Sequence, residues 1–198
     1  MLKRLPETLA IPVEASGRHV HLTQADVEKL FGTSRRLTFK RELSQPGQFL
    51  SEERVCLKGP KGELKNVAVL GPARRRTQIE LSLTDAAALG ISAPVRESGD
   101  TAGSAPISIS ANGADIEAAE GAIIALRHLH VTPRDAKLLN VRDGERVCVR
   151  VNGTRPAVLA DTLVRESEDY RTTIHLDFDE ANACGYSKGT TANIVRRQ

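Results

Sequence analysis

With 198 residues, of which 40% are hydrophobic and 27% charged, the chain has the composition of an ordinary globular protein with one sizeable core or two small ones. No apolar run approaches the roughly 20 residues of a membrane helix, and the chain has no tryptophan, two tyrosines and four phenylalanines for base stacking, so we expect neither a membrane nor a nucleic-acid partner. A net charge of +3 suits a small polyanionic ligand, and three cysteines without Cys-x-x-Cys spacing predict a cytoplasmic protein.

The first predicted elements are a strand and a helix joined by the phrase Arg18-His19-Val20-His21-Leu22-Thr23. Because alternate side chains of a strand point to the same face, His19 and His21 lie about 7 Å apart and can converge on one ion. The threonine that ends the phrase is a good N-cap for a helix over Gln24–Phe31, which a glycine terminates. The strand therefore leads directly into a capped helix, which fixes the course of the chain after the two histidines.

Alternating apolar and polar residues then predict a series of short strands. Val55–Lys58 and Leu64–Leu70 flank a Gly-Pro-Lys-Gly turn and are predicted to form a hairpin. In the next strand, Gln78, Glu80 and Ser82 share the polar face. The remaining elements expected in this half are a short helix over Thr84–Leu89 and a loop over Glu97–Ala105.

The second half repeats this order of elements. Arg127-His128-Leu129-His130-Val131-Thr132 predicts another histidine strand with a capping threonine, and Pro133 occupies the first position of the helix that follows. The other elements expected in this half are strands over Arg146–Val151, Ala157–Leu159 and residues 173–178, and a short helix over Asp179–Cys184.

Three matches between the halves, all in the same order, indicate an internal duplication. Besides the two histidine phrases, Glu53-Arg54-Val55-Cys56 matches Glu145-Arg146-Val147-Cys148, and residues 76–91 can be laid over residues 171–186. The spacing of the matches requires an insertion in the first copy, at about residues 33–52.

The duplication and the many short strands together predict the architecture. We expect a mostly β fold of two small, similar β-barrels with short capping α-helices. The first repeat is expected over residues 11–100 and the second over residues 106–195.

All five histidines fall at positions related by the duplication. Four of them match one another, and the fifth, His175, matches Glu80 in the first copy. Imidazole and carboxylate are both good ligands for divalent metals. The alternative is a duplicated hydrogen-bonding pair that pins each strand to its helix, but it leaves the exchange of Glu80 for His175 unexplained. The predicted metal ligands are His19, His21, Glu80, His128, His130 and His175.

A basic run, Arg74-Arg75-Arg76, follows the predicted hairpin. A solvated turn is the usual explanation for such a run. The residues alone therefore give none of these arginines a functional role.

Several segments carry distinctive motifs in a fixed order. They are Gly17–Leu22, Gln45–Gln48, Leu57–Val67, Leu70–Arg74, Thr77–Glu80, Arg127–His130 and Asp179–Asn182. In these segments the sequence resembles the PduL-type phosphate acyltransferases, also called phosphate propanoyltransferases. The resemblance covers roughly residues 11–195.

The resemblance implies two β-barrel domains, a pair of zinc ions at a dinuclear site and the reaction acyl-CoA + phosphate ⇌ acyl phosphate + CoA. It implies the same six metal ligands, and it makes acyl-CoA, phosphate and acyl phosphate the partners, with coenzyme A as substrate or product. It assigns Arg74 to phosphate binding, which separates this residue from the solvated run. Arg18 and Arg127, on the strand faces opposite the histidines, are further candidates to bind phosphate or the phosphates of CoA.

Two other functions fit the same ligands. In a dinuclear metal-dependent hydrolase, water replaces phosphate as the nucleophile, and in a non-catalytic module the ions only stabilise the fold. Phosphate-dependent release of thiol from acyl-CoA distinguishes these alternatives. The resemblance also implies a homo-oligomer and a place in the lumen of a bacterial microcompartment, in contact with its shell. However, only about ten residues precede the first predicted barrel, Pro6 among them, which argues against targeting by an amphipathic N-terminal peptide.

Overall fold

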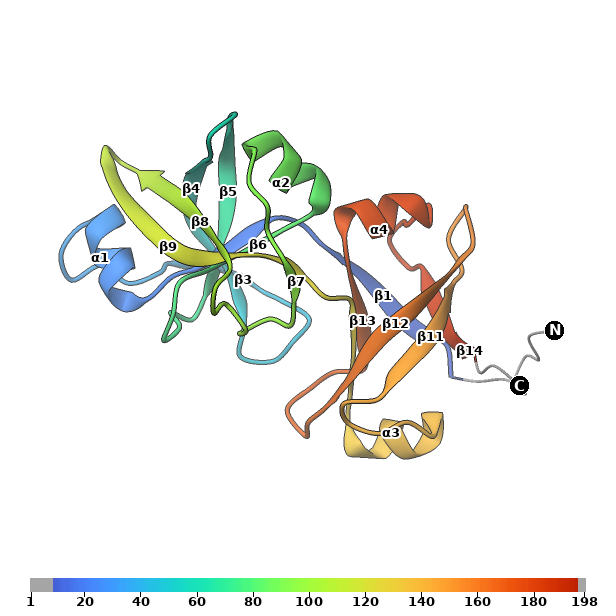
Figure 1. Ribbon diagram of the computed structural model, residues 1–198. Helices are drawn as coiled ribbons and strands as arrows, with labels where there is room; N and C mark the ends of the chain where they lie inside the picture. Colours follow the sequence, from blue (N-terminus) through green and yellow to red (C-terminus); the bar gives the residue numbers. More distant parts are fainter. Residues whose placement is uncertain (1–8, 196–198) are drawn as a thin grey trace. The chain divides into compact units, whose positions relative to one another are not determined.

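The computed structural model describes residues 9–195, which fold into two compact units (Figure 1). We call the unit made of Gly17–Ala125 the N-terminal barrel. The other unit, the C-terminal barrel, combines residues 9–16 with the chain from Leu126 onward. Each unit has its own cluster of buried apolar residues. Within residues 9–195, no helix has both the length and the apolar character needed to cross a membrane.

The N-terminal barrel contains a closed ring of six strands. Its elements are β2 (His19–His21), α1 (Gln24–Phe31), β3 (Phe39–Glu42), β4 (Phe49–Lys58), β5 (Glu63–Gly71), β6 (Gln78–Leu81), α2 (Leu83–Leu89), β7 (Val95–Arg96), β8 (Ala105–Ala111) and β9 (Ala114–Ala125). The ring runs β4-β5-β2-β6-β9-β8, and it closes because β8 also pairs with β4. Strand β3 extends the sheet beside β4, and β7 pairs with β9.

The C-terminal barrel is a second closed ring of six strands. Its elements are β1 (Ile11–Ser16), β10 (His128–Val131), α3 (Pro133–Leu139), β11 (Arg146–Val151), β12 (Ala157–Glu166), β13 (Thr173–Asp177), α4 (Phe178–Ala183) and β14 (Thr191–Val195). The ring runs β1-β13-β10-β12-β11-β14 and closes between β14 and β1. In Figure 1 the blue strand β1 therefore lies among the orange and red strands from the far end of the chain.

The two rings share one pairing scheme. In the N-terminal barrel, β2 is parallel to β5 and antiparallel to β6, just as β10 is parallel to β12 and antiparallel to β13 in the C-terminal barrel. In the N-terminal barrel, β9 then pairs parallel to β6 and antiparallel to β8. In the C-terminal barrel, β1 likewise pairs parallel to β13 and antiparallel to β14. The predicted pair of similar β-barrels with short helices is confirmed.

The residue boundaries of the two barrels differ from the boundaries of the two sequence repeats. The sequence places the first repeat over residues 11–100 and the second over 106–195, whereas β1 belongs to the C-terminal barrel and β8 and β9 to the N-terminal barrel. The physical reason is that the matched segments alone cannot close either ring. Each ring needs further strands, and the chain supplies them from different positions. The predicted insertion, residues 33–52, contains β3 and the first residues of β4.

The short helices begin where the sequence supplies a cap. The threonine caps of α1 and α3 are as predicted. Helices α2 and α4 each begin one residue earlier than expected, because Ser82 and Asp177 are the capping residues and each forms a capping box. Leu83 and Phe178 start these helices and are 61% and 45% exposed, whereas the sequence predicts Phe178 at the end of a strand.

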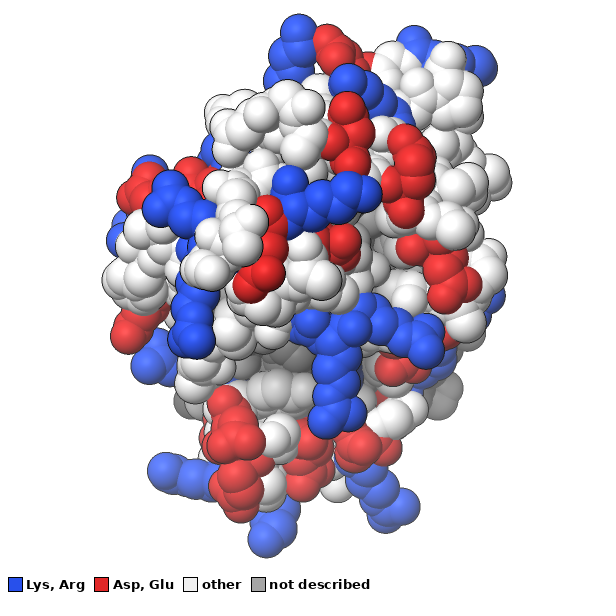
Figure 2. Space-filling model, turned by 90° about the vertical axis from the view of Figure 1, so that its left-hand side faces the viewer, with Lys and Arg blue, Asp and Glu red and all other residues white. Residues whose placement is uncertain are grey.

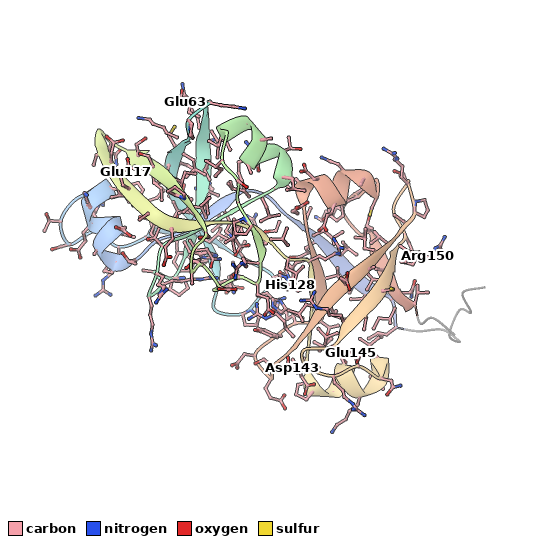
Figure 3. All side chains as sticks on the ribbon, in the orientation of Figure 1. Glu63, Glu117, His128, Asp143, Glu145 and Arg150 are labelled. Atoms are coloured by element: carbon pink, nitrogen blue, oxygen red, sulfur yellow. The ribbon has the colours of Figure 1, made fainter. Side chains whose placement is uncertain are left out.

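Basic and acidic side chains are interleaved on the face of the molecule shown in Figure 2. Exposed ion pairs such as Lys40–Glu52, at 2.9 Å, join neighbouring strands of the N-terminal barrel. Figure 3 places Glu63 and Glu117 at the outer edge of the same barrel, and both residues are exposed. Exposed pairs of this kind contribute little stability, so the buried apolar clusters hold each barrel together.

Candidate metal centres

Two groups of ligand atoms come together in the described part of the chain, one in each barrel. Within each group, the candidate ligand atoms all lie within 4.8 Å of one another. The structure thus brings together all six residues that the sequence singles out, in the two sets that the repeat suggests. We call these sets the N-terminal triad (His19, His21 and Glu80) and the C-terminal triad (His128, His130 and His175).

Strands β2 and β6 position the N-terminal triad. The strands pair with His19 opposite Glu80, and the two-residue alternation of β2 carries His21 to the same face as His19. All three side chains are buried. His19 Nδ1 donates a hydrogen bond to the Gly17 carbonyl at 2.9 Å, and its Nε2 lies 3.4 Å from Glu80 Oε2. The backbone of the preceding residues therefore fixes which nitrogen His19 offers to a metal.

The second histidine of this triad has an unsatisfied nitrogen. Among the described residues, His21 Nδ1 is buried and has no hydrogen-bond partner, although the ring bonds to the backbone of Leu70. Burial, with the positive charges of His19 and Arg74, lowers the pKa of His21 well below its usual value. The ring is therefore neutral, which is the form that binds a metal. An unpaired buried nitrogen costs about 1–3 kcal/mol, and a cation would remove that penalty.

The third member, Glu80, is held by two donors at one of its oxygens. Gln78 Nε2 and Ser98 Oγ donate to Glu80 Oε1 at 2.6 and 2.7 Å. Burial alone would raise the pKa of Glu80, but electrostatic interactions with the neighbouring His19 and His21 and the bond from Ser98 lower it to about 2. The carboxylate is thus ionised at neutral pH, and Oε2 is the oxygen that faces His19.

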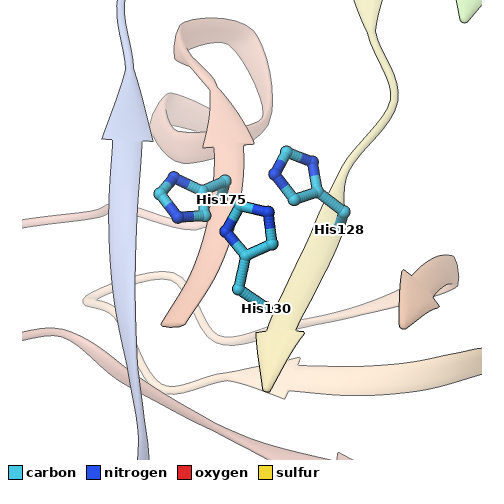
Figure 4. A group of neighbouring side chains, drawn as sticks. All are labelled: His128, His130 and His175. Carbon is cyan, nitrogen blue, oxygen red and sulfur yellow. The ribbon is translucent and has the colours of Figure 1, made fainter. Parts of the chain in front are cut away.

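Strands β10 and β13 position the C-terminal triad in the same way (Figure 4). His128 lies opposite His175 in the strand register, and the ring centroids of the three histidines are 4.6 to 5.1 Å apart. His128 Nδ1 donates to the Leu126 carbonyl at 2.9 Å, the counterpart of the bond between His19 and Gly17.

His130 repeats the features of His21. Its Nδ1 is buried and, among the described residues, lacks a hydrogen-bond partner. Burial, followed by the charges of His128 and His175, lowers the pKa of His130 to about 2. The Tyr170 ring packs against His130 with 4.0 Å between ring centroids. His130 is therefore held in place as a neutral imidazole.

Both triads fit a divalent metal such as zinc. Zinc takes histidine nitrogens and carboxylate oxygens, and its catalytic sites use three protein ligands, which leaves a position for substrate. The buried, unpaired nitrogens of His21 and His130 stand at equivalent positions of the two triads. The alternative explanation of the histidines as hydrogen-bonding pins does not account for these unpaired atoms.

Arg74 and Arg76 have different environments, although they belong to the same basic run. Arg74 donates its backbone N–H to the Leu22 carbonyl at 2.8 Å, and its Nη1 lies 3.5 Å from Ser98 Oγ, next to the N-terminal triad. Arg76 lies 3.7 Å from Glu120, and its side chain is 71% exposed. The solvated-turn explanation therefore suits Arg76, while Arg74 lies where a ligand of the triad could be reached.

Arg18 and Arg127 make equivalent ion pairs. Arg18 binds Asp85 at 2.9 Å, and Arg127 pairs with Glu180. Both acidic residues are the third residues of the capping boxes of α2 and α4. These ion pairs tie each histidine strand to the helix that follows the third ligand, and the proposed contact of both arginines with phosphate stays a prediction.

Sequence reasoning missed the contacts of Ser98 and Tyr170. Ser98 lies in the segment expected to be only a connecting loop, and Tyr170 lies just before β13. No local pattern marks either residue, since each reaches its triad through the course of a loop. The shared polar face of Gln78 and Glu80 was predicted, and the alternation of β6 confirms it.

Comparisons with known proteins agree with this geometry. The sequence pattern of the phosphate propanoyltransferase family matches residues 12–187. A phosphate propanoyltransferase of Clostridioides difficile (strain 630) is 50% identical over 197 residues, which cover 100% of this chain and 94% of that protein. One from Listeria monocytogenes serovar 1/2a is 49% identical, covering 94% of this chain and 88% of the relative. The chain therefore belongs to the phosphate propanoyltransferase family and is a phosphate acyltransferase enzyme.

Proposed function

We propose that the protein catalyses acyl-CoA + phosphate ⇌ acyl phosphate + CoA for short acyl groups, as a dinuclear enzyme with one divalent ion, zinc by preference, in each triad. The observation that carries the proposal is the duplicated triad of ligand atoms, in a chain of this family. The names of the relatives support propanoyl as one of the acyl groups.

Arg74 is proposed to bind the phosphate substrate. A guanidinium group is permanently charged and offers two parallel N–H groups to a phosphate, which a lysine cannot do. The position of Arg74 beside Ser98 and the N-terminal triad supports this role. Phosphate held there would lie next to a bound ion.

The reaction requires a phosphate oxygen to form a bond with the acyl carbon while the bond from that carbon to sulfur breaks. Divalent ions at the triads would polarise the thioester carbonyl and stabilise the departing thiolate. The proton of the attacking phosphate ends on the CoA thiol, so atoms and charge balance. The chain itself supplies neutral imidazoles at His21 and His130 and an ionised Glu80. It also holds the reactants in place, which lowers the barrier by several kcal/mol in well-oriented reactions.

Direct attack without an acyl-enzyme is supported by the state of two of the three thiols, those of Cys56 and Cys184. Burial raises the pKa of the Cys184 thiol, and burial together with Glu63 raises that of Cys56. A raised pKa leaves little thiolate at neutral pH, and the thiolate is the nucleophilic form. These cysteines are therefore poor candidates for an acyl-carrying group.

The test is release of CoA from acetyl-CoA and propanoyl-CoA with and without phosphate, combined with metal analysis of the same sample. We expect phosphate-dependent release and two divalent ions per chain. Release without phosphate would indicate a hydrolase instead. No release, together with unfolding when the metal is removed, would indicate a metal-stabilised module.

Assembly and location stay predictions. Self-association and encapsulation in a microcompartment are expected from the resemblance, and residues 1–8, where a targeting peptide would begin, are outside the described part of the chain. Light scattering of the purified protein tests self-association, and fractionation of native microcompartments tests encapsulation.

A further inference from the structure

We infer that Gln78 is a positioning residue for the N-terminal triad: its amide holds Oε1 of Glu80 and the loop that carries Ser98, so that Oε2 is the oxygen presented to an ion. This inference rests on the proposed function, because it concerns an ion held by that triad.

The amide of Gln78 is fully engaged and its orientation is fixed. The side chain is 2% exposed and lies two residues before Glu80 on the same face of β6. Gln78 Nε2 donates to Glu80 Oε1 at 2.6 Å and to Ser98 Oγ at 3.0 Å. Gly99 N donates to Gln78 Oε1 at 2.7 Å. Because a backbone N–H can only donate, Gly99 requires the amide oxygen on its side and turns the NH2 group toward the carboxylate.

Ser98 completes the support of Glu80. Its single hydroxyl hydrogen goes to Glu80 Oε1 at 2.7 Å, so its oxygen accepts from Gln78. Arg74 Nη1 lies 3.5 Å from Ser98 Oγ. Gln78 thus bonds both Ser98 and Gly99, and it fixes the loop segment that connects the carboxylate with the proposed phosphate-binding arginine.

Two donors at one oxygen decide how Glu80 can act as a ligand. Oε1 accepts from Gln78 and Ser98, while Oε2 faces His19 Nε2 at 3.4 Å. A carboxylate has two oxygens and can bind a metal through one or both. With Oε1 engaged in hydrogen bonds, we infer binding through Oε2 alone.

The C-terminal barrel provides the contrast. Thr173 takes the position of Gln78, opposite His130 in the strand register, and His175 takes the position of Glu80. An imidazole has a single lone pair to direct, once its other nitrogen is protonated. Only the triad with a carboxylate needs a neighbour that selects one oxygen, which explains why a long amide side chain stands in one barrel and a threonine in the other.

The test is cobalt binding to metal-free protein, followed by absorption spectroscopy and by competition with a chelator. Gln78→Met keeps the length of the side chain and removes its donors. Thr173→Val is the matched control at the equivalent position of the C-terminal barrel. The single variants His19→Ala and His128→Ala identify which binding step belongs to which triad.

We expect Gln78→Met to weaken cobalt binding at the N-terminal triad about 10- to 100-fold, as for other residues that orient metal ligands, and to change its spectrum. Binding at the C-terminal triad should stay unchanged, and Thr173→Val should alter neither step. Thermal unfolding of the metal-free protein shows whether the variant is folded, and Ser98→Ala, which removes only one donor, should shift the same step by a smaller factor.

Three results would overturn the inference. If wild-type protein binds cobalt at the N-terminal triad and Gln78→Met and Ser98→Ala bind it equally well, Gln78 has no positioning role, and the proposed function stands. If wild-type protein binds no cobalt there, the metal site of the proposed function fails together with the inference. Equal weakening at both triads with a less stable metal-free fold also counts against a specific role.

Discussion

Arg74→Lys tests the proposed phosphate site with the least disturbance to the fold. The backbone N–H of Arg74 bonds to the Leu22 carbonyl at 2.8 Å, and lysine keeps this bond. Lysine also keeps the positive charge next to Ser98 and Glu80. The substitution therefore removes only the planar, two-pronged geometry of the guanidinium group.

The expected effect follows from the loss of one hydrogen bond between a charged donor and a charged acceptor. Such a bond contributes about 1.5–3 kcal/mol, and each 1.4 kcal/mol corresponds to about tenfold in affinity. We therefore expect the KM for phosphate to rise about 10- to 150-fold, while the KM for acyl-CoA changes by about twofold or less, within the range of context effects.

The assay is initial-rate release of CoA, with phosphate and acyl-CoA varied in turn. Arg76→Lys is the control, because Arg76 is exposed and lies 3.7 Å from Glu120; its kinetic constants should match those of wild type. Equal increases in both KM values for Arg74→Lys would refute the assignment of Arg74 to phosphate.

Three further predictions address metal binding, pH and the core. His128→Ala should lose about one of the two ions and all turnover, and full turnover in a variant that lacks this ion would reject the metal-dependent scheme. Hydrogen bonds from Thr38 lower the pKa of Glu53 despite its partial burial, so this pair should stabilise the fold above pH 4.5 and lose its effect as the pH falls through the lowered pKa. The difference in free energy of unfolding between wild type and Thr38→Val, about 1 kcal/mol or less at this exposed site, should shrink accordingly in urea titrations at several pH values, and a constant difference would exclude the linkage. Leu129→Ala, at a fully buried position, should cost about 2–5 kcal/mol in the same titrations, whereas Leu138→Ala, at a side chain that is 65% exposed, should change stability by about 0.5 kcal/mol at most.

The candidate ligands could be found from the sequence because two strong constraints coincide. The alternation of a strand places His19 and His21 on one face, and the duplication pairs Glu80 with His175. Strand alternation is a local property of the chain, and the duplication is visible as similar segments of the sequence. Neither constraint requires knowledge of the tertiary fold. The contact between Ser98 and Glu80 depends on how a loop returns to the barrel, and no spacing in the sequence encodes it.

The β8–β9 hairpin shows a different kind of omission, because its signal was present. Asn112 and Gly113 have φ angles of 51° and 81°, as in the tight turns that Asn-Gly sequences favour. Alternating isoleucines and serines precede this turn in β8. The hairpin has no counterpart among the matched segments, so the repeat predicted no strand at β8 or β9 and placed residues 106–125 in the second copy.

The place of β1 has a consequence for how the protein is made. Among the described strands, β1 is synthesised first, whereas its partners β13 and β14 are synthesised last. All residues of the N-terminal barrel, up to Ala125, are synthesised before the other strands of the C-terminal barrel. This barrel can therefore fold while β1 still lacks its partner strands and its apolar side chains are not yet buried. Pairing between segments so distant in sequence is slow to form. A truncation that removes β1 should therefore spare the barrel translated first and prevent closure of the one that carries His175.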